Sequence, residues 1–446
     1  MTKTKKPNFI VFMTDDQGYG DLSCMGSPDM QTPHIDALAA SGARFTDWYA
    51  ASSVCSPSRA ALLTGRYPGN SGVRSILGGK RHTSGLLPEV PTLASELKSL
   101  GYHTALYGKW HLGLKEECRP HSHGFEEWTG FMAGCIDYYS HIYYWGGQDN
   151  PTHDMWHNGE EINRDGEYFT EVITESTVDY IKRHAESDEP FFIYVAYNAP
   201  HYPMHAPKKY TDRFAHLPWD KQIMAAMLAA VDDGVGEIVA ELTKQGILDN
   251  TAIFYQSDNG PSRESRNWLD GTEDLYYGGS AGKLKGHKFS LYEGGIRVPG
   301  IWSWPNKIPA NQVITEPCCA IDVFPTIIEA AGGSLDKYEL DGSNIIDVLA
   351  NGAAAPERYL FWEMGPQTAV RHGKWKLVLD GQLEEYTPPV EDDVHLADLS
   401  VDMGETNNIQ TAHPEITKDL SARALQWREQ IEARWTNEWE PKSNMH

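Results

Sequence analysis

Residues 8–16, Asn-Phe-Ile-Val-Phe-Met-Thr-Asp-Asp, carry the pattern from which the fold of this chain can be predicted. The apolar part is as long as an ordinary strand and ends directly at two carboxylates, Asp15 and Asp16. The basic residues before it resemble the start of a signal peptide, but no small-residue cleavage site follows. We therefore interpret residues 8–14 as a strand. We expect a cytoplasmic protein, or a periplasmic or secreted one if a signal peptide has been removed.

Apolar runs of strand length recur along the chain, and helical patterns separate them. Further strands are predicted at residues 103–107, 191–197, 251–256 and 296–302, and helices at residues 33–40, 91–100, 167–185, 219–245 and 323–331. This alternation is typical of an α/β fold with a mainly parallel or mixed central sheet and helices on its faces.

Polar side chains follow four of the predicted strands. Asp15 and Asp16 follow the first strand, and Lys109 and His111 follow the second. His201 and the pair Asp258-Asn259 follow two others. Ligands of open α/β sheets bind beyond the carboxyl ends of the strands, so these side chains are expected to form one site.

The pattern changes after about residue 335. Strands are predicted at residues 359–363 and 369–379, the second range holding two strands with a turn, and a closing amphipathic helix at residues 414–435. We expect a large domain, residues 1–335, and a smaller α+β subdomain with a short antiparallel sheet, residues 336–446.

Composition excludes several classes of function. The 446 residues include 38 Lys and Arg against 62 Asp and Glu, a net charge of −24. A nucleic-acid binder needs basic surface, and anionic membranes also attract basic segments, so neither partner is expected. No apolar run approaches the roughly 18 residues of a membrane-spanning helix.

The chain has six cysteines and no C-x-x-C pair, which argues against a zinc ribbon. Five of them are expected to be reduced thiols in the core or at the surface. These are Cys24, Cys118, Cys135, Cys318 and Cys319. Cys55 is the exception, because Pro57 places it near a helix start. A helix N-terminus favours negative charge, so a thiol at residue 55 is expected to be a reactive thiolate.

Asp15 and Asp16 repel each other unless a cation lies between them. The alternative is a pair of capping residues in a loop. Asp258 and Asn259 favour the metal site, because together the four residues offer hard oxygen ligands. Such a set suits Ca²⁺, or less well Mg²⁺, rather than zinc.

Residues 55–66, Cys-Ser-Pro-Ser-Arg-Ala-Ala-Leu-Leu-Thr-Gly-Arg, resemble the signature of the type I sulfatase family. Other stretches resemble further motifs of that family in the same order. They are residues 15–21, 101–113, 198–203, 257–260 and 288–299. The resemblance spans Asn8 to about Ile328 and implies the alkaline-phosphatase-like fold.

The resemblance also implies a mechanism. A maturation enzyme would oxidise Cys55 to formylglycine, whose hydrate would lie on the cation held by Asp15, Asp16, Asp258 and Asn259 and attack the sulfur of a sulfate ester. The catalytic residues would then be Cys55, Arg59, Lys109, His111, His201 and Lys288.

Each of these side chains has an expected role. Lys109 and Lys288 would bind sulfate, and Arg59 would hold oxygens at residue 55 and balance the carboxylates. His201 would protonate the leaving oxygen, assisted by Lys288. His111 would take the proton whose removal releases sulfate.

The predicted function is therefore hydrolysis of an O-sulfate ester. Aromatic and Arg-bearing stretches at residues 74–82, 135–145 and 263–266 favour a sulfated saccharide bound in an exo-type pocket. The acidic balance disfavours a long, highly sulfated polymer. Three alternatives remain open: a small aryl sulfate, a phosphomonoester or phosphodiester, and a non-catalytic binder of sulfated glycans. The oligomeric state is left open.

Overall fold

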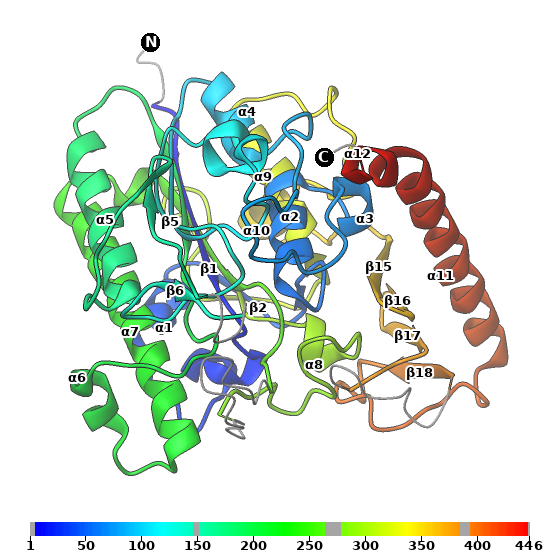
Figure 1. Ribbon diagram of the computed structural model, residues 1–446. Helices are drawn as coiled ribbons and strands as arrows, with labels where there is room; N and C mark the ends of the chain where they lie inside the picture. Colours follow the sequence, from blue (N-terminus) through cyan, green and yellow to red (C-terminus); the bar gives the residue numbers. More distant parts are fainter. Residues whose placement is uncertain (1–4, 146–150, 264–277, 384–392, 445–446) are drawn as a thin grey trace.

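Asn8–Thr14 forms β1, a central strand of the sheet on which the rest of the chain is organised (Figure 1). The computed structural model describes residues 5–145, 151–263, 278–383 and 393–444. Within these residues the main sheet has ten strands. Their order across the sheet is β13 (Gln312–Ile314), β2 (Ala43–Phe45), β12 (Gly300–Ser303), β11 (Thr251–Ser257), β1, β10 (Phe191–Ala196), β4 (His103–Lys109), β5 (Glu127–Phe131), β8 (Trp156–His157) and β9 (Glu160–Glu161).

The middle of this sheet is parallel and its margins are mixed. β11, β1, β10, β4 and β5 run in the same direction. β12 is antiparallel to its neighbour β11, and β8 is antiparallel to its neighbour β5. All carboxyl ends of the parallel strands therefore lie at one edge, which confirms the predicted α/β fold.

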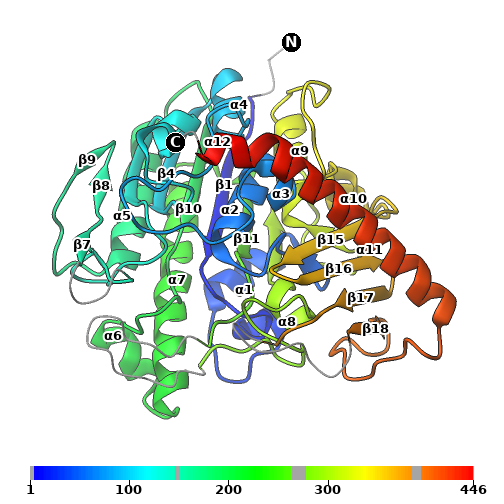
Figure 2. The same ribbon diagram turned by 45° about the vertical axis from the view of Figure 1, so that its right-hand side comes forward.

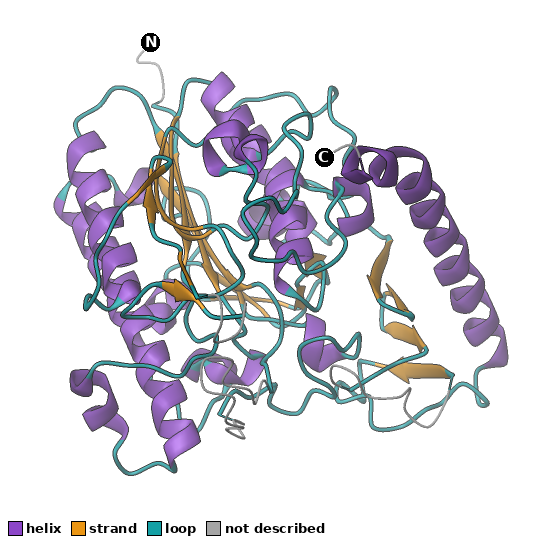
Figure 3. Cartoon of the chain, in the orientation of Figure 1, coloured by secondary structure: helices purple, strands orange, loops and turns teal. Residues whose placement is uncertain are grey.

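Helices cover both faces of the sheet (Figure 3). On one face Phe9 and Val11 of β1 belong to the same core as Leu62 and Phe324, and on the other Ile10 packs in the core that holds the α5 and α7 side chains. The first face carries α2 (Cys55–Thr64), α4 (Leu93–Ser99), α9 (Val323–Ala330) and α10 (Ile346–Asn351), and the second carries α1 (Pro33–Ala40), α5 (Phe169–His184) and α7 (Trp219–Lys244).

Shorter elements connect these layers. They are α3 (Pro68–Ser71), α6 (Lys208–Thr211), α8 (Glu293–Ile296), the paired strands β3 (Trp48–Tyr49) and β14 (Cys318–Cys319), and the hairpin of β6 (Ile142–Tyr143) and β7 (Thr152–His153). Short 3₁₀ turns lie at Tyr19–Asp21, Ser23–Met25, Glu116–Cys118, Pro120–His123, Asp212–Phe214, Leu248–Asn250 and Ala320–Asp322.

A second, four-stranded antiparallel sheet follows the main one, as expected for the C-terminal part. It contains β15 (Tyr359–Met364), β16 (Gln367–His372), β17 (Trp375–Leu379) and β18 (Val394–Asp398). The long helix α11 (Pro414–Arg434) crosses this sheet, as Figure 2 shows, and continues through a π-helical turn, Trp435–Trp439, into α12 (Glu440–Asn444). Trp427 and Ile431 of α11 belong to the same core as Phe9 of β1 and Leu62 of α2.

The prediction of a strand at residues 296–302 is wrong for its first residues. Residues up to Ile296 belong to α8, and β12 begins only at Gly300. Arg297 explains the difference, because its guanidinium lies 2.6 Å from Asp47 and 2.9 Å from Glu293. These contacts and a bridge to Tyr49 hold the segment against β3 instead of the main sheet.

All six cysteines are free. Of the five expected to be reduced thiols in the core or at the surface, four are buried and Cys24 is half-buried. No helix within the described ranges has the length and apolar character needed to span a bilayer.

Candidate active site

The ends of four strands bring the predicted site residues to one edge of the sheet. The backbone N–H of Asp258, after β11, donates to the carbonyl of Thr14 at 3.0 Å. The N–H of Asp15 donates to Ala199, in the loop after β10, at 3.2 Å. On the far side of β10, β4 ends at Lys109. A Cβ on Gly108 would lie 1.9 Å from the carbonyl oxygen of Ala196, so only glycine permits this approach.

Cys55 is the first residue of α2, a helix in which every residue is buried. Its Sγ lies 3.6 Å from a carboxylate oxygen of Asp15, and its side chain is almost fully enclosed. Burial raises the pKa of the Cys55 thiol to about 12, even though Lys109 and Lys288 favour the thiolate. The expectation of a reactive thiolate is therefore wrong for the unmodified residue, because desolvation outweighs the helix terminus.

Three buried carboxylates in this cluster pair with three buried cations. Lys109 Nζ lies 2.6 Å from Asp15, and Lys288 Nζ lies 2.9 Å from Asp16. Arg59, one turn into α2, approaches a single oxygen of Asp258 with two nitrogens, at 2.8 and 3.0 Å. The pairs are Asp15 with Lys109, Asp16 with Lys288 and Asp258 with Arg59. The charges of these six side chains therefore cancel.

The pKa values of the carboxyl groups follow from these neighbours. Burial opposes ionisation, but Lys109 and Lys288 respectively hold the pKa values of Asp15 and Asp16 below the ordinary value. Burial and the nearby charge of Asp15 instead raise the pKa of Asp258. Arg59 and Lys109 oppose this shift of Asp258 without reversing it.

His111 lies two residues beyond β4 with a positive φ of 55°. Its Nε2 lies 3.0 Å from the carbonyl oxygen of Leu77, and because a carbonyl only accepts, Nε2 carries the hydrogen. Burial and the charge of Lys109 lower the pKa of His111 well below its ordinary value, so the ring is neutral. The lone pair is then on Nδ1, which is buried and has no hydrogen-bond partner among the described residues.

The partner of His111 is itself tied to the helix that carries Cys55. The N–H of Leu77 donates to the hydroxyl of Ser56, the residue after Cys55, at 3.1 Å. The orientation of the imidazole and the start of α2 are therefore set by one chain of contacts.

His201 has the opposite arrangement. Its Nδ1 lies 2.6 Å from the carbonyl oxygen of Tyr202 and carries the hydrogen, and Nε2 lies 3.6 Å from Asp16. Burial lowers the pKa of His201, and Asp15 and Asp16 oppose this shift. The hydroxyl of Tyr138 donates to the carbonyl of His201 at 2.9 Å and fixes its loop.

Sequence reasoning missed this positioning role of Tyr138. It considered the stretch 135–145 for sugar contacts without committing a residue there, and Tyr138 is fully buried. Arg74, from another stretch considered for sugar binding, pairs with Glu363 and Glu432 of the C-terminal part. The proposed contacts of residues 264–266 lie outside the described residues.

A divalent cation fits this cluster. Ligand atoms of Asp15, Asp16, Cys55 and His201 all lie within 4.8 Å of one another. Among the ligands predicted from sequence, Asn259 donates to Asp16 at 2.7 Å, and its own side-chain oxygen is buried without a hydrogen-bond partner in the described structure. Such an oxygen suits a hard cation.

One predicted metal ligand, Asp258, has other partners in this arrangement, and one residue not predicted as a ligand joins the group. Asp258 accepts from Arg59 and, at 3.1 Å, from the N–H of Asp16. His201, which sequence reasoning assigned to proton transfer, lies in the metal-competent group. The position of His201 was visible in sequence only as a polar residue after a strand.

Comparisons with known proteins agree with the geometry. The model of the sulfatase family matches residues 7–334. N-acetylgalactosamine-6-sulfatase of Sus scrofa is 33% identical over 387 residues, covering 80% of this chain and 69% of that protein. Arylsulfatase A of Homo sapiens is 30% identical, covering 94% of this chain and 87% of that protein. The structure of Ps i-CgsB in complex with k-i-k-neocarrahexaose has a TM-score of 0.83 and 30% identity, covering 97% of this chain and 94% of that one.

Proposed function

This chain belongs to the sulfatase family, whose members are sulfuric ester hydrolases, and from that premise we propose that it removes an O-sulfate group from a saccharide. The relatives that support this substrate class include an N-acetylgalactosamine-6-sulfatase and a protein solved with a neocarrahexaose. Within that class we favour a mono- or oligosaccharide bound at its end.

One observation carries the proposal: Cys55, the Asp15-Asp16 pair and the Asp258-Asn259 pair, far apart in sequence, converge on a single buried cluster. The three carboxylates and three cationic side chains of this cluster cancel in charge. A divalent cation would therefore give the cluster a net positive charge of two, which attracts a sulfate monoester.

Residue 55 and the cation define the chemistry of the site. Asp15, Asp16 and Asn259 would hold the ion, with Asp258 beside them, and we favour Ca²⁺ because these ligands are mostly oxygens. When bound, the ion supplies positive charge toward sulfate oxygens. Oxidation of Cys55 to formylglycine by a maturation enzyme, followed by addition of water to the aldehyde, would supply an oxygen nucleophile there, which the enclosed thiol of high pKa does not.

The remaining side chains divide the binding and proton transfers. Lys109 and Lys288 offer two ammonium groups for the equatorial oxygens of the transferring sulfuryl group. His111 presents a lone pair on Nδ1 and can take a proton beside residue 55. His201 is proposed to protonate the leaving alcohol, and the negative charge of a bound sulfate ester favours the imidazolium form that this role requires.

Of two other enzymatic functions, one remains a candidate and the other is disfavoured. The similarity to arylsulfatase A keeps a small aryl sulfate as an alternative substrate. A two-metal phosphatase would need further ligands near residue 55, where this chain instead places Lys109 and Lys288. These lysines favour sulfate over phosphate ester hydrolysis.

The test is a matched set of substrates. Protein produced together with a formylglycine-generating enzyme is assayed on position-defined sulfated mono- and disaccharides, on nitrophenyl sulfate and on nitrophenyl phosphate. We expect sulfate release from at least one sugar to exceed both nitrophenyl reactions in kcat/KM. Faster phosphate turnover would overturn the proposal, and faster nitrophenyl sulfate turnover would favour the aryl substrate.

A variant of residue 55 provides the control. Cys55→Ala should abolish turnover and leave the fold unchanged, because alanine is tolerated at a helix start. Circular dichroism and thermal unfolding check the fold. Binding of a sulfated sugar to wild-type protein that carries the aldehyde, without turnover, would instead indicate a non-catalytic glycan binder.

A further inference from the structure

A second group of metal-ligating side chains lies on other elements than the sulfatase site. It consists of His141, just before β6, His153, at the end of β7, and Asp165, in the loop before α5. Ligand atoms of all three lie within 4.8 Å of one another. The carboxylate of Asp165 is 3.4 Å from Nε2 of His153 and 3.8 Å from Nδ1 of His141.

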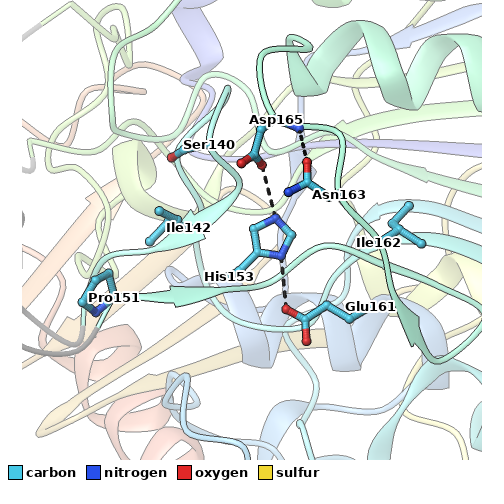
Figure 4. Close-up of a pocket in the computed structure, with 8 residues that line it drawn as sticks. All are labelled: Ser140, Ile142, Pro151, His153, Glu161, Ile162, Asn163 and Asp165. Atoms are coloured by element: carbon cyan, nitrogen blue, oxygen red, sulfur yellow. Dashed lines mark hydrogen bonds and ion pairs between the residues drawn. The ribbon is translucent and has the colours of Figure 1, made fainter.

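The outer nitrogen of each imidazole has a partner that fixes its proton. His141 Nε2 lies 3.2 Å from the backbone carbonyl of Glu167, and His153 Nδ1 lies 3.2 Å from the carboxylate of Glu161 (Figure 4). Both partners are acceptors, so both outer nitrogens carry hydrogen in the neutral rings. The inner nitrogens, Nδ1 of His141 and Nε2 of His153, then carry lone pairs.

These inner nitrogens have no hydrogen-bond partner among the described residues, and the side chain of His141 has no exposed surface. Two lone pairs and a carboxylate oxygen therefore face one another. This arrangement is repulsive unless a metal ion or a proton lies between the three atoms. An imidazole whose far N–H is held by a carboxylate or carbonyl is also the usual form of a metal ligand.

The spacing suits a small ion. In a tetrahedral zinc site with bonds of about 2.0–2.1 Å, neighbouring ligand atoms are about 3.3 Å apart. The distances of 3.4 and 3.8 Å are close to this value. Two nitrogens and one oxygen favour zinc over the hard cation preferred at the Asp15-Asp16 cluster.

A metal ion can reach this group of side chains from solvent. A cavity of about 530 Å³ is lined by both His153 and Asp165, which Figure 4 shows beside Ser140 and Asn163. The side chain of Asp165 is 52% exposed, so an ion can enter from solvent. The cavity also leaves room for a water molecule as fourth ligand.

We propose that His141, His153 and Asp165 bind one zinc ion, with the fourth coordination position open to this cavity. The ion joins the β6–β7 hairpin to the segment before α5. Tyr168, three residues after Asp165, stacks on Tyr138 with ring centroids 5.5 Å apart, and Tyr138 holds the loop of His201. Zinc therefore anchors the frame around the active site and is not placed at the reacting atoms.

The experiment measures zinc binding by protein without a polyhistidine tag. The protein is stripped of transition metals, kept in excess Ca²⁺ to occupy hard-cation sites, and titrated with Zn²⁺ against a chromophoric indicator. Co²⁺ is used in parallel, because its visible absorption reports tetrahedral coordination. The ligand variants are His153→Ala and Asp165→Asn. His121→Ala removes an exposed histidine elsewhere, and Cys55→Ala removes a ligand of the other cluster.

We expect one zinc ion per chain in the wild type, His121→Ala and Cys55→Ala, and its loss in both ligand variants. Glu161→Gln keeps the three ligands, removes the carboxylate that faces His153 Nδ1 and also loses an exposed ion pair with Arg81. It should weaken binding by about 10–100-fold and serves if a ligand variant does not fold. Wild-type protein that takes up no zinc would overturn the proposal. The same holds if His153→Ala and Asp165→Asn, shown to be folded, bind zinc as the wild type does, or if only Cys55→Ala loses it.

Discussion

His111 and His201 carry their hydrogens on opposite ring nitrogens, although both lie in loops just after parallel strands. The carbonyl of Leu77 holds the hydrogen of His111 on Nε2, and the carbonyl of Tyr202 holds that of His201 on Nδ1. The Nε2 of His201 faces Asp16, one of the proposed metal ligands. A backbone carbonyl thus decides which nitrogen of each ring can take part in proton transfer.

The first prediction concerns His201. His201→Ala should lower kcat/KM for sulfated sugars by about 10²–10⁴-fold, the range typical of general acid catalysis. The loss for nitrophenyl sulfate should be much smaller, because nitrophenolate leaves without a proton. Steady-state kinetics on both substrates check this, and equal losses would mean that His201 only positions the sulfate group.

At the scale of elements, α3 and the C-terminal helices meet through glycines. Gly72 ends α3 with a φ of +85°, and a Cβ there would lie 2.8 Å from the indole of Trp439. Gly352 ends α10 with a φ of +65°, but a Cβ there would have no atom within 4 Å. The two positions share a backbone conformation and differ only in packing.

This pair gives the second prediction. Gly72→Ala and Gly352→Ala should each lower the free energy of unfolding by about 1–2 kcal/mol, because alanine is strained in the left-handed conformation. Gly72→Ala should lose about 1–3 kcal/mol more, because overpacking displaces Trp439. Urea unfolding monitored by tryptophan fluorescence checks the difference, and equal losses would mean that the C-terminal helices adjust freely.

Across the whole molecule, a buried ionic cluster connects the two sheets. Lys376 of β17 lies 2.9 Å from Glu293 of α8 and 3.1 Å from Glu405. The side chains of all three are fully buried. Glu293 also accepts from Tyr49 at 2.7 Å. The C-terminal sheet is therefore fixed to α8 and β3 by charge as well as by apolar packing.

This cluster makes stability depend on pH. Burial raises the pKa of Glu405 to about 7, despite Lys376. Between the ordinary value of 4.5 and about 7, the folded chain keeps a proton that the unfolded chain has lost, so this contribution to the free energy of unfolding falls as the pH rises. Glu293 behaves in the opposite way: burial would raise its pKa, but Lys376 and Arg297 lower it to about 2. Its contribution is present above pH 4.5 and is lost as the pH falls toward 2.

The third prediction uses the separation of these two pH windows. In Glu405→Gln the group that titrates up to about pH 7 is absent. The free energy of unfolding of this variant, relative to the wild type, should therefore rise between pH 4.5 and about 7. Denaturant unfolding across this window measures it. Glu357→Gln, which removes an 89% exposed carboxylate, is the control. Parallel curves for Glu405→Gln and the wild type would contradict the prediction.

Much of the fold was predictable because its signals are local. The apolar run before Asp15, the long helical pattern at Trp219–Lys244 and the glycine-ended helices each depend on neighbouring residues only. Short elements were missed for the same reason. β2 has three residues, and β18 has five, Val-His-Leu-Ala-Asp, which form no continuous apolar run. Both are strands because of their neighbours in the sheets.

The residue types of the candidate active site could also be predicted from the sequence, since strand ends and the motif around Cys55 are sequence features. Their partners could not. Arg59 pairs with Asp258 across 199 residues of sequence. The tautomers of His111 and His201 and the burial that keeps Cys55 protonated also depend on residues that are distant in sequence or on the folded surroundings. Such contacts depend on desolvation and on distances between strand ends, and these quantities exist only once the sheet has formed.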